Sequence, residues 1–170
     1  MTLSHKLNVR WIVKEDDNTL SELAAQVLID VLMNTARPVI GFATGGTPRK
    51  LYQHLVRKSQ ADQQLQRHWQ DMIGFNEPSD RLEIETHVTH LSEGTRQANA
   101  LYFQDGTVPL QAITMGMGSI LHAKKIILLA FGSVKRQALL RAFSGTIDTR
   151  CPASFLQLHN NIIIFTDQIL

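Results

Sequence analysis

Apolar positions along this chain form two kinds of pattern: short continuous runs, and faces that recur every three or four residues. The continuous runs cover residues 39–43, 126–131 and 162–165, and such runs are typical of strands buried on both faces. The clearest helical face lies in residues 19–35. Because strands alternate with helices, the pattern predicts a parallel sheet with helices on both faces.

Weaker patterns indicate further elements around these runs. We expect strands over residues 8–13, 83–90 and 112–115, and helices over residues 48–58, 92–103, 120–124 and from residue 135 to about 144. Thr19 followed by Glu22 has the pattern of a capping box, and Ser92 is suited to cap a later helix. The inner face of the last helix is expected to consist of Ala138, Leu139, Ala142 and Phe143.

The amino-acid composition indicates how many domains the chain forms and which segment lies outside the core. A chain of 170 residues that is 44% hydrophobic can bury one core, so we expect a single domain over residues 1–170. Residues 59–71 are rich in glutamine, with Leu65 and Trp69 as the only large apolar side chains. We therefore interpret residues 59–72 as a polar connection that contributes little to the core.

Charge and cysteine content exclude several classes of function. The net charge is only +2, with scattered Lys and Arg, which argues against a nucleic-acid partner. The lone Cys151 excludes an internal disulfide, and no apolar run approaches the ~20 residues that span a bilayer. We expect a cytoplasmic protein without a membrane partner. His87 and His90 lie in a predicted strand, where their spacing does not suit a metal, so no metal site is expected.

Two strand-to-helix turns are candidates for binding an anion. Gly45, Gly46 and Thr47 follow the first apolar run, and Thr47 and Pro48 are suited to begin a helix. Free N–H groups at such a turn suit a phosphate. The second turn, residues 132–135, ends in a lysine. Because both turns follow strands of a parallel sheet, they could meet over one anion, with Lys135 as the counter-charge. The alternatives are an ordinary turn that binds nothing and a solvated lysine.

Glu77 lies in a loop after an apolar segment, between Asn76 and Pro78. A carboxylate there could orient a base or polarise a substrate, or it could be an ordinary surface acid. No serine, cysteine or histidine lies in a recognisable nucleophile motif.

Five segments of the chain follow the order seen in one enzyme family. They are Ala-Thr-Gly-Gly-Thr-Pro at 43–48, Phe-Asn-Glu-Pro at 75–78, Thr-Arg-Gln-Ala-Asn-Ala at 95–100, Ala-Ile-Thr-Met-Gly-Met-Gly at 112–118 and Leu-Gln-Leu-His at 156–159. Over about residues 8–58 and 73–167 the chain thus resembles the glucosamine-6-phosphate deaminases. The galactosamine-6-phosphate isomerases and, more distantly, the 6-phosphogluconolactonases are similar.

The resemblance implies a doubly wound α/β fold and a phosphosugar substrate. Family members convert a hexosamine 6-phosphate to fructose 6-phosphate and ammonia without an organic cofactor. An aspartate moves the proton between C2 and C1, and a histidine opens the sugar ring. By position, Gly45, Gly46 and Thr47 match the family's phosphate turn and Lys135 its lysine. Glu77 matches the glutamate that orients the histidine.

The chain also departs from the family pattern. The family has a long segment before Phe-Asn-Glu-Pro, whereas here only residues 59–72 fill that interval. Met72 stands where the family has its ring-opening histidine, the proton-transfer aspartate has no counterpart, and Leu101 falls where many deaminases have a phosphate-binding arginine. We expect an internal deletion that removes part of the central segment of the fold.

Three hypotheses for function follow. The first is a hexosamine-6-phosphate deaminase or isomerase whose activity is weak or lost. The second is a non-catalytic phosphosugar-binding or regulatory module, and the third a nucleotide-binding α/β domain. A sheet with a missing strand would expose apolar edges, which a homo-oligomer could cover.

Overall fold

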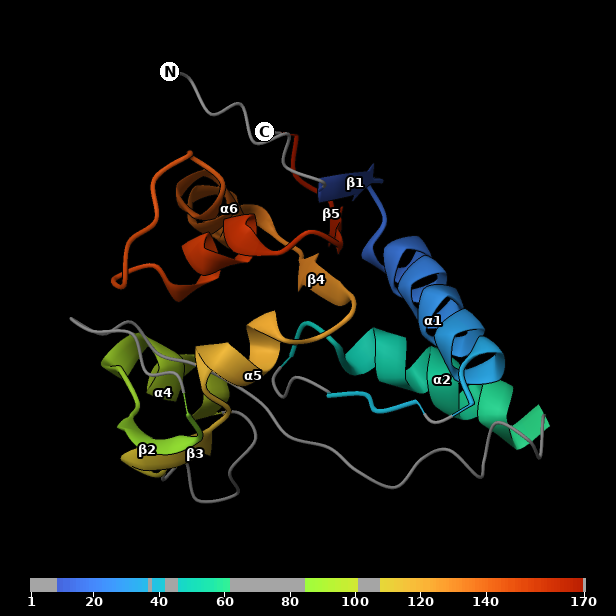
Figure 1. The fold of residues 1–170 in the computed structure, drawn as a ribbon, viewed down its shortest axis with the longest axis horizontal. Coiled ribbons are helices and arrows are strands. Elements are labelled where there is room, and N and C mark those ends of the chain that lie inside the picture. Colours follow the sequence, from blue (N-terminus) through green and yellow to red (C-terminus); the bar gives the residue numbers. More distant parts are fainter. Residues whose placement is uncertain (1–8, 37, 42–45, 62–84, 101–107, 170) are drawn as a thin grey trace.

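The computed structural model describes residues 9–36, 38–41, 46–61, 85–100 and 108–169, which contain both helices and strands (Figure 1). In chain order the elements are β1 (Val9–Val13), α1 (Asp17–Asn34), α2 (Arg49–Ala61), β2 (His87–His90), α4 (Glu93–Asn99), β3 (Gln111–Thr114), α5 (Met117–Leu121), β4 (Ile126–Ala130), the 3₁₀ turn η2 (Ser133–Lys135), α6 (Arg136–Ala142), the 3₁₀ helix η3 (Pro152–Leu158) and β5 (Ile162–Thr166). No helix among the described residues has the length and apolar character needed to cross a membrane.

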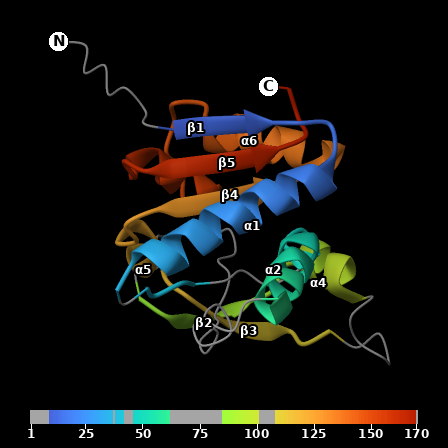
Figure 2. The ribbon, with the colours of Figure 1, turned by 90° about the vertical axis from the view of Figure 1, so that its right-hand side faces the viewer.

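The main sheet has three parallel strands in the order β1-β5-β4. In register, Val9 and Ile126 both pair with Ile162, and this pairing continues along the strands to Thr166. Figure 2 shows the three strands running in the same direction, with α1 crossing one face and α6 behind the other. The α/β class, the parallel sheet and the helices on both faces are as the sequence predicts.

The central strand β5 builds a core on each face of the sheet. Its side chains alternate, as they must in a strand. Ile163 and Phe165 belong to one cluster with Leu20, Ala24 and Ala25 of α1 and Leu51 and Leu55 of α2. Ile162 and Ile164 pack on the other face, with Leu139 of α6. This explains why residues 162–165 are all apolar: a strand covered on both faces has no polar side.

The first helix is capped by a residue that the sequence analysis did not select. Asp16, not Thr19, is the N-cap, and its carboxylate accepts hydrogen bonds from the N–H groups of Asn18 (3.1 Å) and Thr19 (2.8 Å). The Thr19 hydroxyl also donates to this carboxylate, and these bonds hold the pKa of Asp16 below its ordinary value of 3.8. The expected capping box of Thr19 with Glu22 is therefore wrong, because Asp16 satisfies the first-turn donors.

Helix α2 lies against α1 through an apolar seam with polar contacts at its border. Leu51 and Leu55 are buried in the same cluster as residues of α1. At the border, Lys50 Nζ lies 2.6 Å from Asp17 Oδ1, and Lys58 donates to Gln26 over 2.6 Å. Exposed ion pairs of this kind contribute little, so the buried leucines set the position of α2.

Strands β2 and β3 are not part of the parallel sheet. They form a separate antiparallel pair, in which Val88 lies opposite Ile113, and both views place this pair apart from β1, β5 and β4 (Figures 1 and 2). The Leu91 N–H donates to the Leu110 carbonyl, which extends the ladder toward the connection between the strands. Val88 and Ile113 are 60% and 69% exposed. The strands that the sequence predicts over residues 83–90 and 112–115 thus pair with each other rather than with the parallel sheet.

Other expectations also differ in detail. Of the apolar run expected as a strand over residues 39–43, residues 42 and 43 lie outside the described residues. Residues 38–41 form no strand; Val39 is 96% exposed, and Ile40 packs on the core. Helix α5 begins at Met117, three residues before the expected start. In α6, Leu139 and Ala142 are buried, whereas Ala138 is exposed and does not belong to the inner face. The 3₁₀ helix η3 was not predicted.

Two adjacent residues of α2 test this packing. Leu55 is fully buried, whereas 51% of Val56 is exposed. We expect Leu55→Ala to lower the free energy of unfolding by about 2–5 kcal/mol, because it leaves a cavity between the helices and β5. Val56→Ala should change it by roughly 0.5 kcal/mol or less. Urea denaturation of both variants measures the difference, and equal losses would contradict the described orientation of α2.

Candidate functional site

The glycine turn lies at the amino end of α2. The Arg49 N–H donates to the Gly46 carbonyl over 3.2 Å, and the Tyr52 N–H donates to the Pro48 carbonyl over 3.0 Å. Helix α2 thus begins one residue after the expected start, with Gly46 exposed, Thr47 half-buried and Pro48 buried. Pro48 has no N–H to leave unpaired at this position. Burial raises the pKa of Tyr52 to about 12, so this phenol is neutral at physiological pH.

The lysine turn follows β4 directly. Gly132 has φ +87° and ψ 148°, a backbone conformation that is essentially restricted to glycine. The Lys135 N–H closes the turn on the Gly132 carbonyl over 2.9 Å. The Lys135 side chain is exposed, and it forms no ion pair with any residue that the structure describes.

A carboxylate after β5 holds this turn. Both oxygens of Asp167 accept from the Gly132 N–H, each over 2.9 Å, and the Gln168 side-chain amide donates to Asp167 Oδ1 over 2.7 Å. Arg136 Nε donates to the Ile169 carbonyl over 3.2 Å. The segments that follow β4 and β5 are thus joined at the carboxyl edge of the sheet. Sequence reasoning missed Asp167, although an acid directly after a buried parallel strand is a signal for this edge.

The predicted site residues are only partly described. Gly45 and Glu77 lie outside the described residues, so their assignment stays a prediction. Gly46 and Thr47 lie at the start of α2, on the side of the sheet that α1 covers, and Lys135 precedes α6 on the other side. Within the described parts of the chain, no hydrogen bond or ion pair joins the two turns. Their convergence on one phosphate stays a prediction as well.

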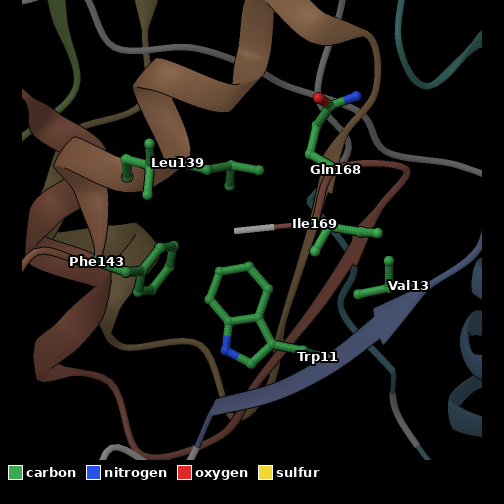
Figure 3. A pocket seen from close by; sticks show the side chains of 7 residues that line it. Trp11, Val13, Leu139, Phe143, Gln168 and Ile169 are labelled. Carbon is green, nitrogen blue, oxygen red and sulfur yellow. The ribbon is translucent and has the colours of Figure 1, made fainter.

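One cavity in the described structure is apolar and unsuited to a sugar phosphate. It has a volume of about 580 Å³ and lies between β1 and α6 (Figure 3). Trp11 and Phe143 meet edge to face across it, with ring centroids 5.3 Å apart. No charged side chain lines it. A second hollow of about 370 Å³ is lined by Glu85, Thr86, Gly118, Ser119 and His122. Neither contains Gly46, Thr47 or Lys135.

The histidine at the end of the 156–159 motif is structural. His159 is buried, and its Nε2 lies 2.6 Å from the Ala123 carbonyl, so Nε2 carries the proton and donates. Its Nδ1 then accepts from the Asn161 N–H over 3.1 Å, and the Asn161 side chain donates to the Lys124 carbonyl over 3.0 Å. Both ring nitrogens are occupied in holding the turn between α5 and β4, so His159 is not a candidate acid or base.

The described residues contain no grouping of three His, Cys, Asp or Glu side chains that could hold a metal ion. At the carboxyl edge the described residues place an exposed lysine on a braced turn, which is suited to binding an anion.

Solved structures place this architecture in a known class. The 6-phosphogluconolactonase from Trypanosoma cruzi superimposes with a TM-score of 0.62 over 97% of both chains at 14% identity. A monomeric glucosamine-6-phosphate deaminase superimposes with a TM-score of 0.82 at 25% identity, covering 94% of this chain and 97% of that one. The fold is that of the 6-phosphogluconolactonase-like α/β proteins. No protein-family model matches the chain.

Sequence relatives define the family within this class. The glucosamine-6-phosphate deaminase of Oceanobacillus iheyensis is 31% identical, and the match covers 94% of this chain and 94% of the relative. The deaminase of Clostridium botulinum (strain Langeland) is 47% identical over 97 residues, which is 56% of this chain and 40% of that protein. The chain belongs to the glucosamine-6-phosphate deaminase family.

The alignments also agree with an internal deletion. The match to the Oceanobacillus protein extends over 235 positions, more than the 170 residues of this chain. Part of the relative therefore has no counterpart here. The Clostridium match, in contrast, spans only about two fifths of that relative.

Two glycines that differ in backbone conformation test the lysine turn. A Cβ built on Gly132 or on Gly94 of α4 meets nothing within 4 Å, but only Gly132 has a positive φ. Gly132→Ala should therefore cost about 1–3 kcal/mol of unfolding free energy through backbone strain alone. Gly94→Ala should be neutral or stabilising by about 0.5–1 kcal/mol. Urea denaturation of both variants measures their free energies of unfolding. If Gly132→Ala does not lower the free energy of unfolding, the described conformation of the turn is contradicted.

Proposed function

We propose that this chain binds a hexosamine 6-phosphate and deaminates it slowly or not at all. The observation that carries this proposal is the match to a glucosamine-6-phosphate deaminase over 94% of both chains, which nonetheless leaves part of the relative without a counterpart. In the family, the residues that bind the phosphate and the residues that transfer protons lie in different motifs. A deletion can therefore remove the proton-transfer residues and retain the phosphate-binding ones.

Binding is assigned to the two turns. Gly46 and Thr47 supply backbone N–H groups at the start of α2, where the helix dipole favours an anion. Lys135 supplies a positive charge from the opposite side of the sheet. A phosphate in contact with both would lie beyond the carboxyl edge, where ligands of open α/β sheets bind. Gly45 is assigned to the same phosphate turn by its place in the motif.

The chemical step is where the chain is deficient. Met72 stands at the position of the ring-opening histidine, and a thioether neither accepts nor donates a proton at neutral pH. The proton-transfer aspartate has no counterpart. A positioned acid or base typically contributes ~10²–10⁴-fold to the rate, so losing two leaves little turnover. Glu77, assigned to orient the histidine, then lacks the group on which it would act.

Calorimetry and an ammonia assay test binding and turnover separately. We expect glucosamine 6-phosphate to bind, and Lys135→Ala to weaken binding by about 10–100-fold, because hydrogen bonds to charged groups contribute about 1.5–3 kcal/mol. Lys125→Ala removes another exposed lysine, next to β4, and should leave the affinity unchanged. Ammonia release should fall well below the ~1–10³ s⁻¹ that is typical of enzymes.

Several outcomes contradict this proposal. Turnover within the typical range would show that the acid–base groups have been replaced, and its loss in Glu77→Gln would locate them near the Phe-Asn-Glu-Pro motif. If glucosamine 6-phosphate does not bind, or if Lys135→Ala and Lys125→Ala lower its affinity equally, the assignment of Lys135 to the phosphate is contradicted.

A further inference from the structure

The Gly132 N–H is held by a carboxylate in a symmetric arrangement. It lies 2.9 Å from both Oδ1 and Oδ2 of Asp167, a residue 35 positions further along the chain. Gly132 itself has φ +87° and ψ 148°. Glycine reaches this conformation without steric strain, but it also reaches many others, so a contact is needed to select this one. The two-oxygen contact with Asp167 is the described interaction that fixes the direction of this N–H.

Further hydrogen bonds hold Asp167 in place. The Gln168 side-chain amide donates to Asp167 Oδ1 over 2.7 Å, and the Gln168 N–H donates to the hydroxyl of Thr166 over 3.1 Å. Thr166 is fully buried at the end of β5. The carboxylate is thus anchored to the most buried strand of the sheet, and through Gly132 it holds the start of the turn that ends in Lys135.

We propose that Asp167 is a positioning residue that holds the Lys135 turn in the conformation that receives the sugar phosphate. The inference rests on the proposed function, because it concerns the same phosphate site. Asp167 is an anion and does not bind phosphate itself; it acts through the Gly132 N–H and the 3₁₀ turn that follows. Without this contact, Gly132 can adopt other backbone conformations, and the turn no longer holds Lys135 in one position.

The direction in which the affinity changes when Asp167 is replaced distinguishes a positioning role from a purely electrostatic one. Removing a negative charge near an anion site strengthens anion binding if charge alone matters. Removing a positioning residue weakens it. Asp167→Asn removes the charge and retains an oxygen that can accept from the Gly132 N–H, whereas Asp167→Ala removes both. The two variants therefore differ in the hydrogen bond and share the loss of charge.

Calorimetry with glucosamine 6-phosphate tests the proposal. We expect Asp167→Ala to weaken binding by about 10-fold or more, as for the loss of a hydrogen bond to a charged group. Asp167→Asn should remain within about three-fold of the original affinity or bind more tightly. In a Lys135→Ala background, Asp167→Ala should have no further effect on affinity, because its role passes through that lysine. A residue that only stabilises the fold would not show this dependence.

Gln168→Ala provides a second route if Asp167→Ala fails to fold. It removes the neutral donor to Asp167 Oδ1 and leaves every charge in place, and it should weaken binding by about 2–10-fold only when Lys135 is present. The inference is overturned if Asp167→Ala leaves the affinity unchanged or raises it. It is also overturned if Asp167→Ala weakens binding as much in the Lys135→Ala background as it does when Lys135 is present. If Lys135→Ala itself leaves the affinity unchanged, the proposed function fails instead, so the two failures are distinguishable.

Discussion

The described structure depends on β5 being buried on both faces. Ile163 and Phe165 join the core beneath α1 and α2, while Ile162 and Ile164 join the core beneath α6. Both neighbouring strands hydrogen-bond to this one strand, so each helical layer is fixed through it. The same strand ends at Thr166, directly before Asp167. The element that organises the core thus also carries the carboxylate that holds the Lys135 turn.

Much of the architecture could be predicted from sequence because it depends on local pattern. The runs that form β4 and β5 are apolar throughout, which is typical of strands covered on both faces. The antiparallel pairing of β2 with β3 could not be predicted, because strand partners are set by contacts distant in sequence. The cap of α1 was missed for a local reason: Asp16 lies in a run of residues that can all cap, and sequence alone does not rank them.

The candidate site shows the same division. The glycine turn and Lys135 could be proposed from the sequence because they lie in short strand-to-helix turns of a kind that can bind phosphate. Asp167 was not found, because its significance lies in a hydrogen bond to Gly132 across 35 residues. Family membership supplies the substrate class for the proposal, and part of the relative has no counterpart in this chain. On this account the deletion separates phosphate recognition from proton transfer.

The central claim is that one phosphate contacts both the start of α2 and the turn before α6. A titration of the ¹⁵N-labelled protein with glucosamine 6-phosphate, followed by NMR, tests it most directly. The account predicts that the amide resonances of Gly46 and Thr47 and those of Gly132 and Lys135 shift together, with one common dissociation constant. Shifts confined to one turn, or two different dissociation constants, would contradict it.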